Sequence, residues 1–247
     1  MEPFTSGAAA VAAEAAAEGA AMQEAALHAI ELSSAAAEKS AVADVTLNEK
    51  TIHTLNELLD QDKYKKLAEF RELSQTDPEA ARALSGDIHV KGQMGEAIME
   101  AQLSPAGEVK SQVPVELDGA PSSNVVDLQL TESKMNLKQT ELTVEDGGIV
   151  STDNYDVMKG ESASFEVKNG GMPYLRQELA AGELQQQIAA GKSISDHSFV
   201  VINEDTARAI MANPEAGFKI IQAIQDAGGK LIVGLPDQAV QSAIFLS

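Results

Sequence analysis

The sequence contains no cysteine and no tryptophan, and aromatic residues make up only 4% of its 247 residues. Without cysteine there is no disulfide framework, no thiolate-bound zinc and no cysteine nucleophile. No run of about 18 apolar residues occurs, so no membrane span is expected. The first four residues, Met-Glu-Pro-Phe, lack the basic and leucine-rich parts of a Sec signal peptide. We therefore expect a cytoplasmic protein, or one exported into a target cell by a non-Sec route.

Basic residues are also scarce, with 18 lysines and arginines against 38 aspartates and glutamates and a formal net charge of -20. Residues 1–90 and residues 91–247 each carry at least twice as many acidic as basic residues. The broad basic surface typical of nucleic-acid-binding proteins is therefore not expected. The most basic stretch is Lys63-Tyr64-Lys65-Lys66, which is interpreted as a solvated helix face or, alternatively, as a contact to a phosphate backbone.

Changes in composition divide the chain into three parts. Residues 1–43 are rich in alanine and acidic, which predicts a helical arm that is either solvated or a delivery segment for a protein partner such as a secretion component. Residues 44–90 contain two short amphipathic helices and a further helical turn that starts at Asp77-Pro78, and we interpret them as a helical linker region. Residues 91–247 alternate between helical and strand patterns and form the main domain.

The pattern of the main domain predicts an α/β fold. Its order is αβββαβ with a mixed sheet, followed by an αβα extension and preceded by the α-helical N-terminal region. Residues 131–160 are polar and are predicted to form an inserted hairpin or long loop. The helical run 174–190 changes its apolar face midway, which predicts two pieces hinged at Gly182. The other predicted elements are a helix at 92–103, strands at 108–117, 123–130, 162–169, 198–203 and 230–235, and a turn at 118–121.

The candidate chemistry lies on two of these strands. Side chains alternate along a strand, so Glu166 and Lys168 share one face, about 7 Å apart. Asp127 lies on the opposite face of its strand from its apolar neighbours and joins them if the two strands pair. Carboxylates hold Mg²⁺ or Mn²⁺, and a neighbouring lysine orients or deprotonates the attacking water. The carbonyl oxygen of Val167 is a further candidate metal ligand.

Taken together, Gly92-x-x-Gly95-Glu96 on a helix, Asp127 on a strand and Glu166-Val167-Lys168 on a later strand resemble the PD-(D/E)xK (restriction-endonuclease-like) nuclease superfamily. The resemblance implies a metal-dependent nuclease that hydrolyses DNA, with RNA as an alternative. It implies metal ligands at Asp127 and Glu166, with the Val167 carbonyl as the further candidate named above, a catalytic Lys168 and an assisting Glu96. It also implies a polar residue on the following helix, for which Gln186 is the candidate.

Each of these residues also has a non-catalytic interpretation. Glu166 and Lys168 are alternatively a surface pair on an edge strand, Asp127 a turn former, Glu96 an acid favoured by a helix N-terminus, and Gln186 part of a solvated helix face. At the level of function, the alternatives are a non-catalytic acidic binding protein on a degenerate nuclease-like fold and an assembly protein with an oligomerising helical N-terminus.

The layout of a helical segment before a short nuclease domain is similar to that of bacterial toxins and effectors. This similarity would add an immunity protein to the expected partners. A few local cations would then contact the nucleic acid, and those that flank the candidate site in sequence are Lys134, Lys138, Lys159 and Arg176. By the same reasoning, Lys65 and Lys66 are expected to be distant from the site.

Overall fold

The computed structural model describes residues 45–117, 124–145 and 147–246. The arm predicted for residues 1–43 and the turn predicted at 118–121 lie outside these ranges. None of the helices in the described part of the chain has the length and apolar content that a membrane span requires.

The N-terminal helices follow the predicted amphipathic pattern. Asn48 caps the first of them by accepting a hydrogen bond from the Thr51 nitrogen, and Asp77 caps the last by accepting one from the Ala80 nitrogen. Pro78 occupies the first turn of that last helix, where its missing N–H costs nothing. The two predicted helices and the further helical turn are confirmed. They are α2 (Glu49–Leu59), the short η2 (Asp62–Tyr64), α3 (Lys65–Thr76) and α4 (Pro78–Leu84).

A longer helix, α5 (Ile88–Leu103), connects this region to the sheet. It begins before the predicted residue 92 because the Asp87 side chain caps it, accepting hydrogen bonds from the nitrogens of His89 and Val90. The apolar residues of the region interpreted as a helical linker belong to the same core cluster as α5 and part of the sheet. Leu67 and Phe70 of α3 are fully buried in that cluster.

The sheet has seven strands in the order β1-β2-β5-β6-β7-β3-β4. The central pairs β5–β6 and β6–β7 are parallel, and the other four pairs are antiparallel, so the sheet is mixed as expected. The strands are β1 (Val109–Val115), β2 (Asn124–Leu130), β3 (Leu137–Glu145), β4 (Gly148–Val157), β5 (Ala163–Lys168), β6 (His197–Asn203) and β7 (Lys230–Leu235).

The stretch 131–160, predicted as a hairpin or long loop, is the hairpin β3–β4. In the sequence it is inserted between β2 and β5, but in space it lies at the opposite edge of the sheet, beside β7, where Glu141 pairs with Ile232. The insertion therefore leaves β2 free to pair directly with β5. That pairing brings the candidate residues of the two strands together.

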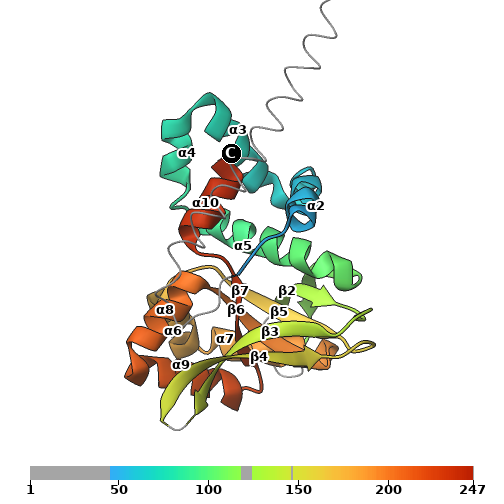
Figure 1. The fold of residues 1–247 in the computed structure, drawn as a ribbon, viewed down its shortest axis with the longest axis vertical. Coiled ribbons are helices and arrows are strands. Elements are labelled where there is room, and N and C mark those ends of the chain that lie inside the picture. The colour runs from blue at the N-terminus through green and yellow to red at the C-terminus, as the bar shows by residue number, and fades with distance from the viewer. Residues whose placement is uncertain (1–44, 118–123, 146, 247) are drawn as a thin grey trace, which may run out of the picture.

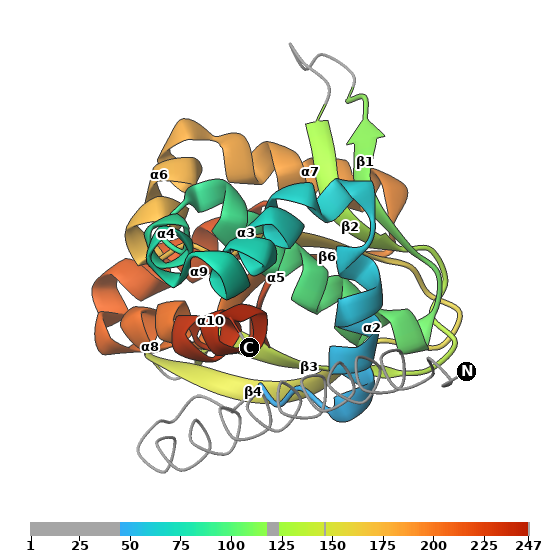
Figure 2. The ribbon, with the colours of Figure 1, turned by 90° about the horizontal axis from the view of Figure 1, so that it is seen from above.

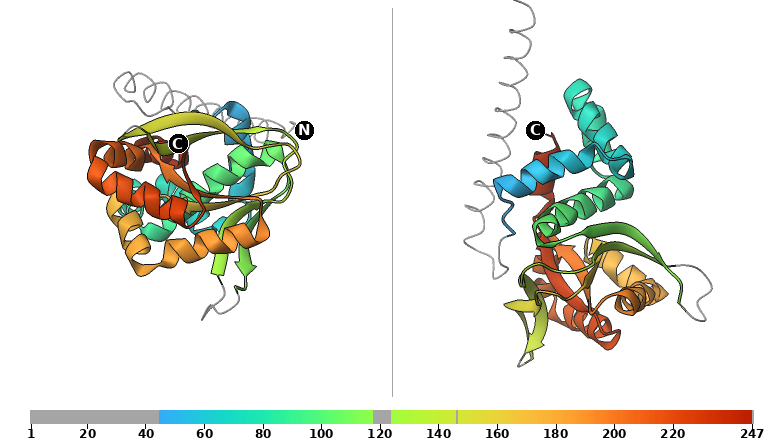
Figure 3. Two further views of the ribbon diagram at one scale, coloured as in Figure 1. Left: turned by 90° about the horizontal axis from the view of Figure 1, so that it is seen from below. Right: turned by 90° about the vertical axis from the view of Figure 1, so that its right-hand side faces the viewer.

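Helices cover both faces of the sheet (Figures 1 and 2). On one face lies α5, with α2, α3, α4 and the C-terminal helix stacked beyond it, and on the other face lie the helices numbered α6 to α9 (Figure 3). Strand β6 is buried on both sides, because Phe199 and Val201 face the α5 layer while Val200 and Ile202 face the other. The remaining helices are η3 (Ser104–Ala106), α6 (Met172–Ala181), α7 (Glu183–Ile194), α8 (Glu204–Ala212), α9 (Pro214–Asp226) and α10 (Gln238–Leu246).

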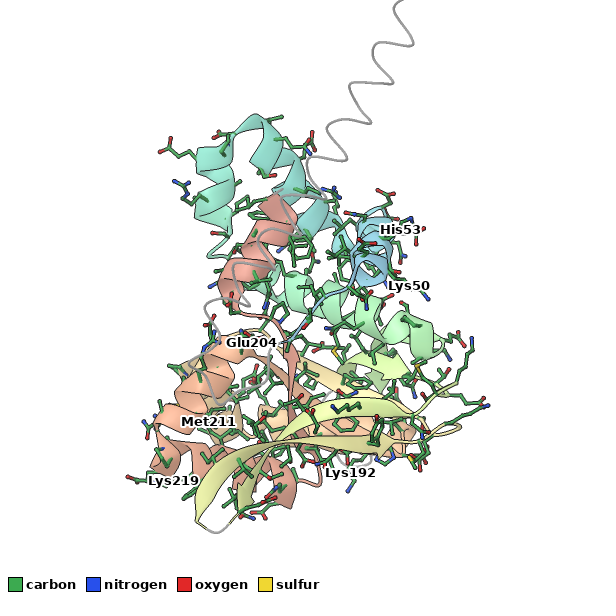
Figure 4. All side chains as sticks on the ribbon, in the orientation of Figure 1. Lys50, His53, Lys192, Glu204, Met211 and Lys219 are labelled. Atoms are coloured by element: carbon green, nitrogen blue, oxygen red, sulfur yellow. The ribbon has the colours of Figure 1, made fainter. Side chains whose placement is uncertain are left out.

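Two features help to hold the helices in these positions. Gly182 separates α6 from α7 in the left-handed conformation, with φ of 77°, which confirms the predicted hinge. Glu204, at the beginning of α8, accepts a hydrogen bond of 2.6 Å from the Val45 nitrogen (Figure 4). This bond ties the beginning of the described chain to the opposite layer of the fold.

Candidate active site

The candidate site lies where β2 and β5 separate. Their ladder ends at the pair Leu128–Phe165, and beyond it the Asp127 carboxylate accepts a hydrogen bond of 2.9 Å from the Val167 nitrogen. The N–H and C=O of one strand residue point to the same edge of the strand. The Val167 carbonyl therefore faces the same gap as Asp127. Asp127 lies within β2, so the interpretation as a turn former does not hold.

Glu166 and Lys168 lie side by side on the same face of β5, as predicted from the alternation of the strand. Their side chains are buried, with exposed fractions of only 4% and 6%. The Lys168 ammonium lies 2.9 Å from Glu166 Oε1. β5 is an interior strand, between β2 and β6, so the two residues are not a surface pair on an edge strand.

A second buried carboxylate, from Glu178 on α6, lies 2.8 Å from the Lys168 ammonium. This residue was not among the candidates. The sequence does contain a signal for it, since Glu178 stands three residues after Leu175 and directly before Leu179, on the apolar side of the predicted helix. A carboxylate on the buried side of a helix requires a partner, and Lys168 supplies one.

Glu96 on α5 is brought to the site by a residue that the sequence did not indicate. The Gln112 side-chain nitrogen donates to Glu96 Oε2 at 2.9 Å and to Asp127 Oδ1 at 3.4 Å. Among the described residues, Gln112 is the only non-glycine residue with positive φ, at 53°. Such strain persists where the surrounding structure holds it, often at functional sites. Glu96 lies in the third turn of α5, beyond the reach of the helix N-terminus, so that interpretation fails.

Close packing between α5 and β5 positions Glu96. A Cβ atom at Gly95 would lie 2.9 Å from both Val167 Cγ1 and Asn169 Cβ, so only glycine allows this approach. The buried Asn169 side chain donates to the Lys91 carbonyl oxygen at 2.7 Å and to Gln241 Oε1 at 2.6 Å. These bonds hold α5 and α10 at the end of β5, directly after Lys168.

The charges of the cluster perturb one another. Burial and the negative charge of Asp127 raise the pKa of Glu96 from 4.5 to about 7. Burial and the same charge raise the pKa of Glu166 well above its usual value, and burial raises that of Asp127. Burial alone would lower the pKa of Lys168, but Glu166 and Glu178 raise it above its usual range. Lys168 is therefore protonated at neutral pH, while Glu96, Asp127 and Glu166 hold protons to a higher pH than ordinary carboxyl groups.

The structure does not bring Gln186 to this cluster, because its side chain is exposed on the outer side of α7. α7 runs antiparallel to β5. Near the end of α7, Gly191 lies against Ser164. Gln187 comes one helical turn before Gly191, and one turn has about the length of two strand residues, so Gln187 lies at the same height along β5 as Glu166. The Gln187 Oε1 atom is buried without a hydrogen-bond partner. The Gln185 Oε1 atom is likewise buried without a partner, so the exposed Gln186 is the least suited of the three glutamines to a role in the cluster.

Three of the four cations expected to flank the site lie elsewhere, and the fourth, Arg176, lines a separate cavity between α6, α7 and α9. Lys134 and Lys159 are next to the pairing of Ser133 with Glu161, before β5 begins and at the opposite end of that strand from Lys168. Lys138 forms an ion pair of 2.6 Å with Asp153 across the β3–β4 hairpin. Sequence proximity misplaced Lys134 and Lys159 because they lie at the opposite end of β5 from Lys168. It misplaced Lys138 because the inserted hairpin carries this residue to the far edge of the sheet.

Within the described ranges, no three histidine, aspartate or glutamate side chains are arranged as a metal-binding group. A cation at this site would therefore have two side-chain carboxylates at most, together with main-chain oxygen and water. Comparison of the chain with protein-family models, with curated proteins and with solved structures finds no match in any of the three.

Proposed function

We propose that this protein is a metal-dependent nuclease that hydrolyses phosphodiester bonds, with DNA as the expected substrate. One observation carries the proposal. The carboxylates of Asp127 and Glu166 lie within hydrogen-bonding reach of each other, buried beside Lys168, in the gap where β2 and β5 separate. Two carboxylates in such contact require a proton or a cation between them.

The arrangement of elements supports a restriction-endonuclease-like core within the α/β fold. The elements α5, β1, β2, β5, the α6–α7 pair and β6 follow one another in the order αβββαβ when the β3–β4 hairpin is set aside. Their strands are also neighbours in the sheet, in the order β1-β2-β5-β6. The candidate residues Glu96, Asp127, Glu166 and Lys168 all belong to this set of elements.

The residues present fit a divalent cation. Four carboxyl groups surround a single lysine, so the acidic groups of the cluster outnumber its one basic group. They belong to Glu96, Asp127, Glu166 and Glu178. Glu166 Oε2 is buried and receives no hydrogen bond. Asp127, Glu166 and the Val167 carbonyl would hold Mg²⁺ or Mn²⁺, hard cations that prefer oxygen ligands. When bound, the cation would polarise the scissile phosphate and lower the pKa of a water molecule.

The side chains around the metal position have separate roles in the proposed reaction. Lys168, whose pKa is raised, stays protonated and supplies positive charge to the phosphate in the transition state, so it does not act as a base. Glu96, with a pKa of about 7, is matched to accept a proton from water near neutral pH. Gln112 holds that carboxylate next to Asp127. Glu178 fixes the position of the Lys168 ammonium.

The test is degradation of plasmid DNA and of RNA by the purified protein, with Mg²⁺, with Mn²⁺ and with EDTA. We expect metal-dependent cleavage that Asp127→Asn and Glu166→Gln each reduce by about a thousandfold, since a lost metal site removes several kcal/mol of stabilisation. Glu215→Gln, on the exposed face of α9, is the control. Absence of metal-dependent cleavage by the wild-type protein, or undiminished cleavage by both site variants, contradicts the proposal.

The second candidate function is a non-catalytic acidic binding protein on a degenerate nuclease-like fold. The net charge of -20 favours it, because this charge opposes long-range attraction of nucleic acid. The same experiment separates the two functions. A wild-type protein that cleaves neither DNA nor RNA, and whose melting temperature does not respond to millimolar Mg²⁺ or Mn²⁺, fits the binding protein.

A further inference from the structure

A cavity of about 420 Å³ lies between the first part of α5, the η2–α3 turn and β1. Its lining residues come from these three elements. They are Lys63, Tyr64, Lys66, Ile88, His89, Gly92, Gln93, Glu96, Ser111 and Gln112. Glu96 and Gln112 belong to the candidate active site, so the cavity adjoins the reactive carboxylates. A molecule that fills it would extend from the α3 region to Gln112, which contacts both Glu96 and Asp127.

One wall of the cavity is formed by residues of the most basic stretch of the chain, Lys63 to Lys66. Lys66 is exposed, and no described carboxylate is in ion-pair contact with it, although Asp87 lies near enough to interact with its charge. His89 is also exposed and offers an imidazole N–H donor. Beside them the Ile88 side chain is 73% exposed, which is unusual for a large apolar residue. An ammonium, an imidazole and an apolar surface together complement a sugar-phosphate.

This wall is held rigidly to α5. The Gln93 side chain donates to the Lys63 carbonyl oxygen at 3.1 Å and accepts from the Leu67 nitrogen at 3.1 Å, so one amide clamps both ends of the basic turn. The Lys63 ammonium lies 2.7 Å from both oxygens of the buried Glu100, which also accepts from the Tyr64 hydroxyl at 2.8 Å. Lys63 is thus neutralised and serves as an anchor. The anchoring fixes the main chain of the turn that carries Lys66, and it leaves Lys66 as the available cation of this wall.

We propose that this cavity binds the phosphodiester backbone of the strand whose scissile phosphate lies at Asp127 and Glu166, with Lys66 and His89 as its phosphate contacts. The inference rests on the proposed nuclease function and deepens it. It also reverses the expectation from sequence distance, in which Lys65 and Lys66 were remote from the site. A single available cation in the cavity that adjoins Glu96 reconciles phosphate binding with a net charge of -20.

The chain offers a matched pair of variants for the test. Lys65 and Lys66 are consecutive, both are exposed and both lie in the first turn of α3, but only Lys66 lines the cavity. Lys65→Gln and Lys66→Gln therefore change the net charge equally and differ only in the cavity contact. A second pair is His89→Ala with His53→Ala as control, because His53 is exposed on α2 and does not line the cavity (Figure 4).

Binding is measured by fluorescence anisotropy with a labelled DNA oligonucleotide in Ca²⁺, and cleavage is measured with Mg²⁺. We expect Lys66→Gln to weaken binding about five- to tenfold. The slope of log affinity against log salt concentration should fall by about one, which corresponds to one phosphate contact. In the cleavage assay KM should rise while kcat stays unchanged. The affinity of Lys65→Gln is expected to stay within about twofold of that of the wild type, because salt screens the effect of a charge that does not contact the DNA.

Equal losses in Lys65→Gln and Lys66→Gln, with a wild-type protein that cleaves normally, would overturn the cavity as the binding site and leave the proposed function intact. A wild-type protein that neither binds nor cleaves the oligonucleotide would overturn both. Circular dichroism spectra of all four variants verify the fold, and the exposed position of each substituted side chain makes unfolding unexpected.

Discussion

Asp127 and Val167 are joined by a hydrogen bond of 2.9 Å between the side chain of one strand and the main-chain nitrogen of the next. It occupies the place where the β2–β5 ladder has ended. The bond keeps the two strands together and at the same time leaves a gap that the Val167 carbonyl and the Glu166 carboxylate face. A structural role and a chemical role thus fall on the same carboxylate, and substitutions can separate them.

Asp127→Asn keeps an acceptor oxygen for the Val167 nitrogen but removes the negative charge beside Glu166. We expect its free energy of unfolding, measured by urea denaturation without metal, to equal or exceed that of the wild type, because repulsion is relieved. Asp127→Ala leaves the Val167 N–H without a partner and should cost about 1–3 kcal/mol. Equal destabilisation by the two variants would show that the hydrogen bond does not support the strands.

Lys168 and Glu178 form a buried ion pair, so their substitutions should be strongly coupled. Lys168→Met leaves two carboxylates buried without a cation and is expected to lower the free energy of unfolding by about 3–5 kcal/mol at pH 7. Glu178→Gln in the same background should recover part of this loss. The measurement is a double-mutant cycle by urea denaturation, and simple additivity of the two effects would exclude an energetic link between them.

Stability should depend on pH through Glu96, whose pKa rises from 4.5 to about 7 on folding. Between these values the folded protein binds more protons than the unfolded chain, so the free energy of unfolding falls as pH increases from about 4.5 to 7. Glu96→Gln removes this contribution. In metal-free buffer we expect the variant to show a shallower fall than the wild type, and superimposable pH profiles would contradict the raised pKa.

Gly95 and Gly92 provide a matched test of the packing between α5 and β5. Gly95→Ala places a methyl group against Val167 and Asn169 and should destabilise the protein by about 1–3 kcal/mol. At Gly92 a Cβ atom meets nothing within 4 Å, so Gly92→Ala should stabilise the same helix by about 0.5–1 kcal/mol. Thermal unfolding measures both effects, and two shifts of the same sign would be inconsistent with this packing.

The strained backbone at Gln112 predicts opposite effects on stability and on activity. Gln112→Gly removes the cost of a side chain at φ of 53°, so stability should be maintained or increase by about 1 kcal/mol. The same change removes the amide that joins Glu96 to Asp127, and nuclease activity should fall. Gln112→Ala should lose activity without gaining stability. A Gln112→Gly variant with full activity would show that the bridge is dispensable.

The parts of the fold governed by local patterns were predictable from the sequence. Apolar spacing located the helices that contain Leu67 and Phe70, and alternation placed Glu166 and Lys168 on one face of a strand. The change of apolar face located the hinge at Gly182. These features depend on residues a few positions apart, and the geometry of a helix or strand relates such residues directly.

Contacts between distant segments were decided only by the tertiary structure. Gln112 looked ordinary in the sequence, and the apolar side of its helix marked Glu178 as buried without naming its partner. The roles of both residues depend on partners that other elements bring to them. Lys134 appeared close to the site and Lys66 remote, but Lys134 lies at the opposite end of β5 from Lys168, while Lys66 of α3 lines the same cavity as Glu96. The sequence by itself determined which faces are apolar and which residues can carry the chemistry. The packing of those faces against one another determined which of these residues meet, because proximity in the folded chain follows burial and strand order and not the number of intervening residues.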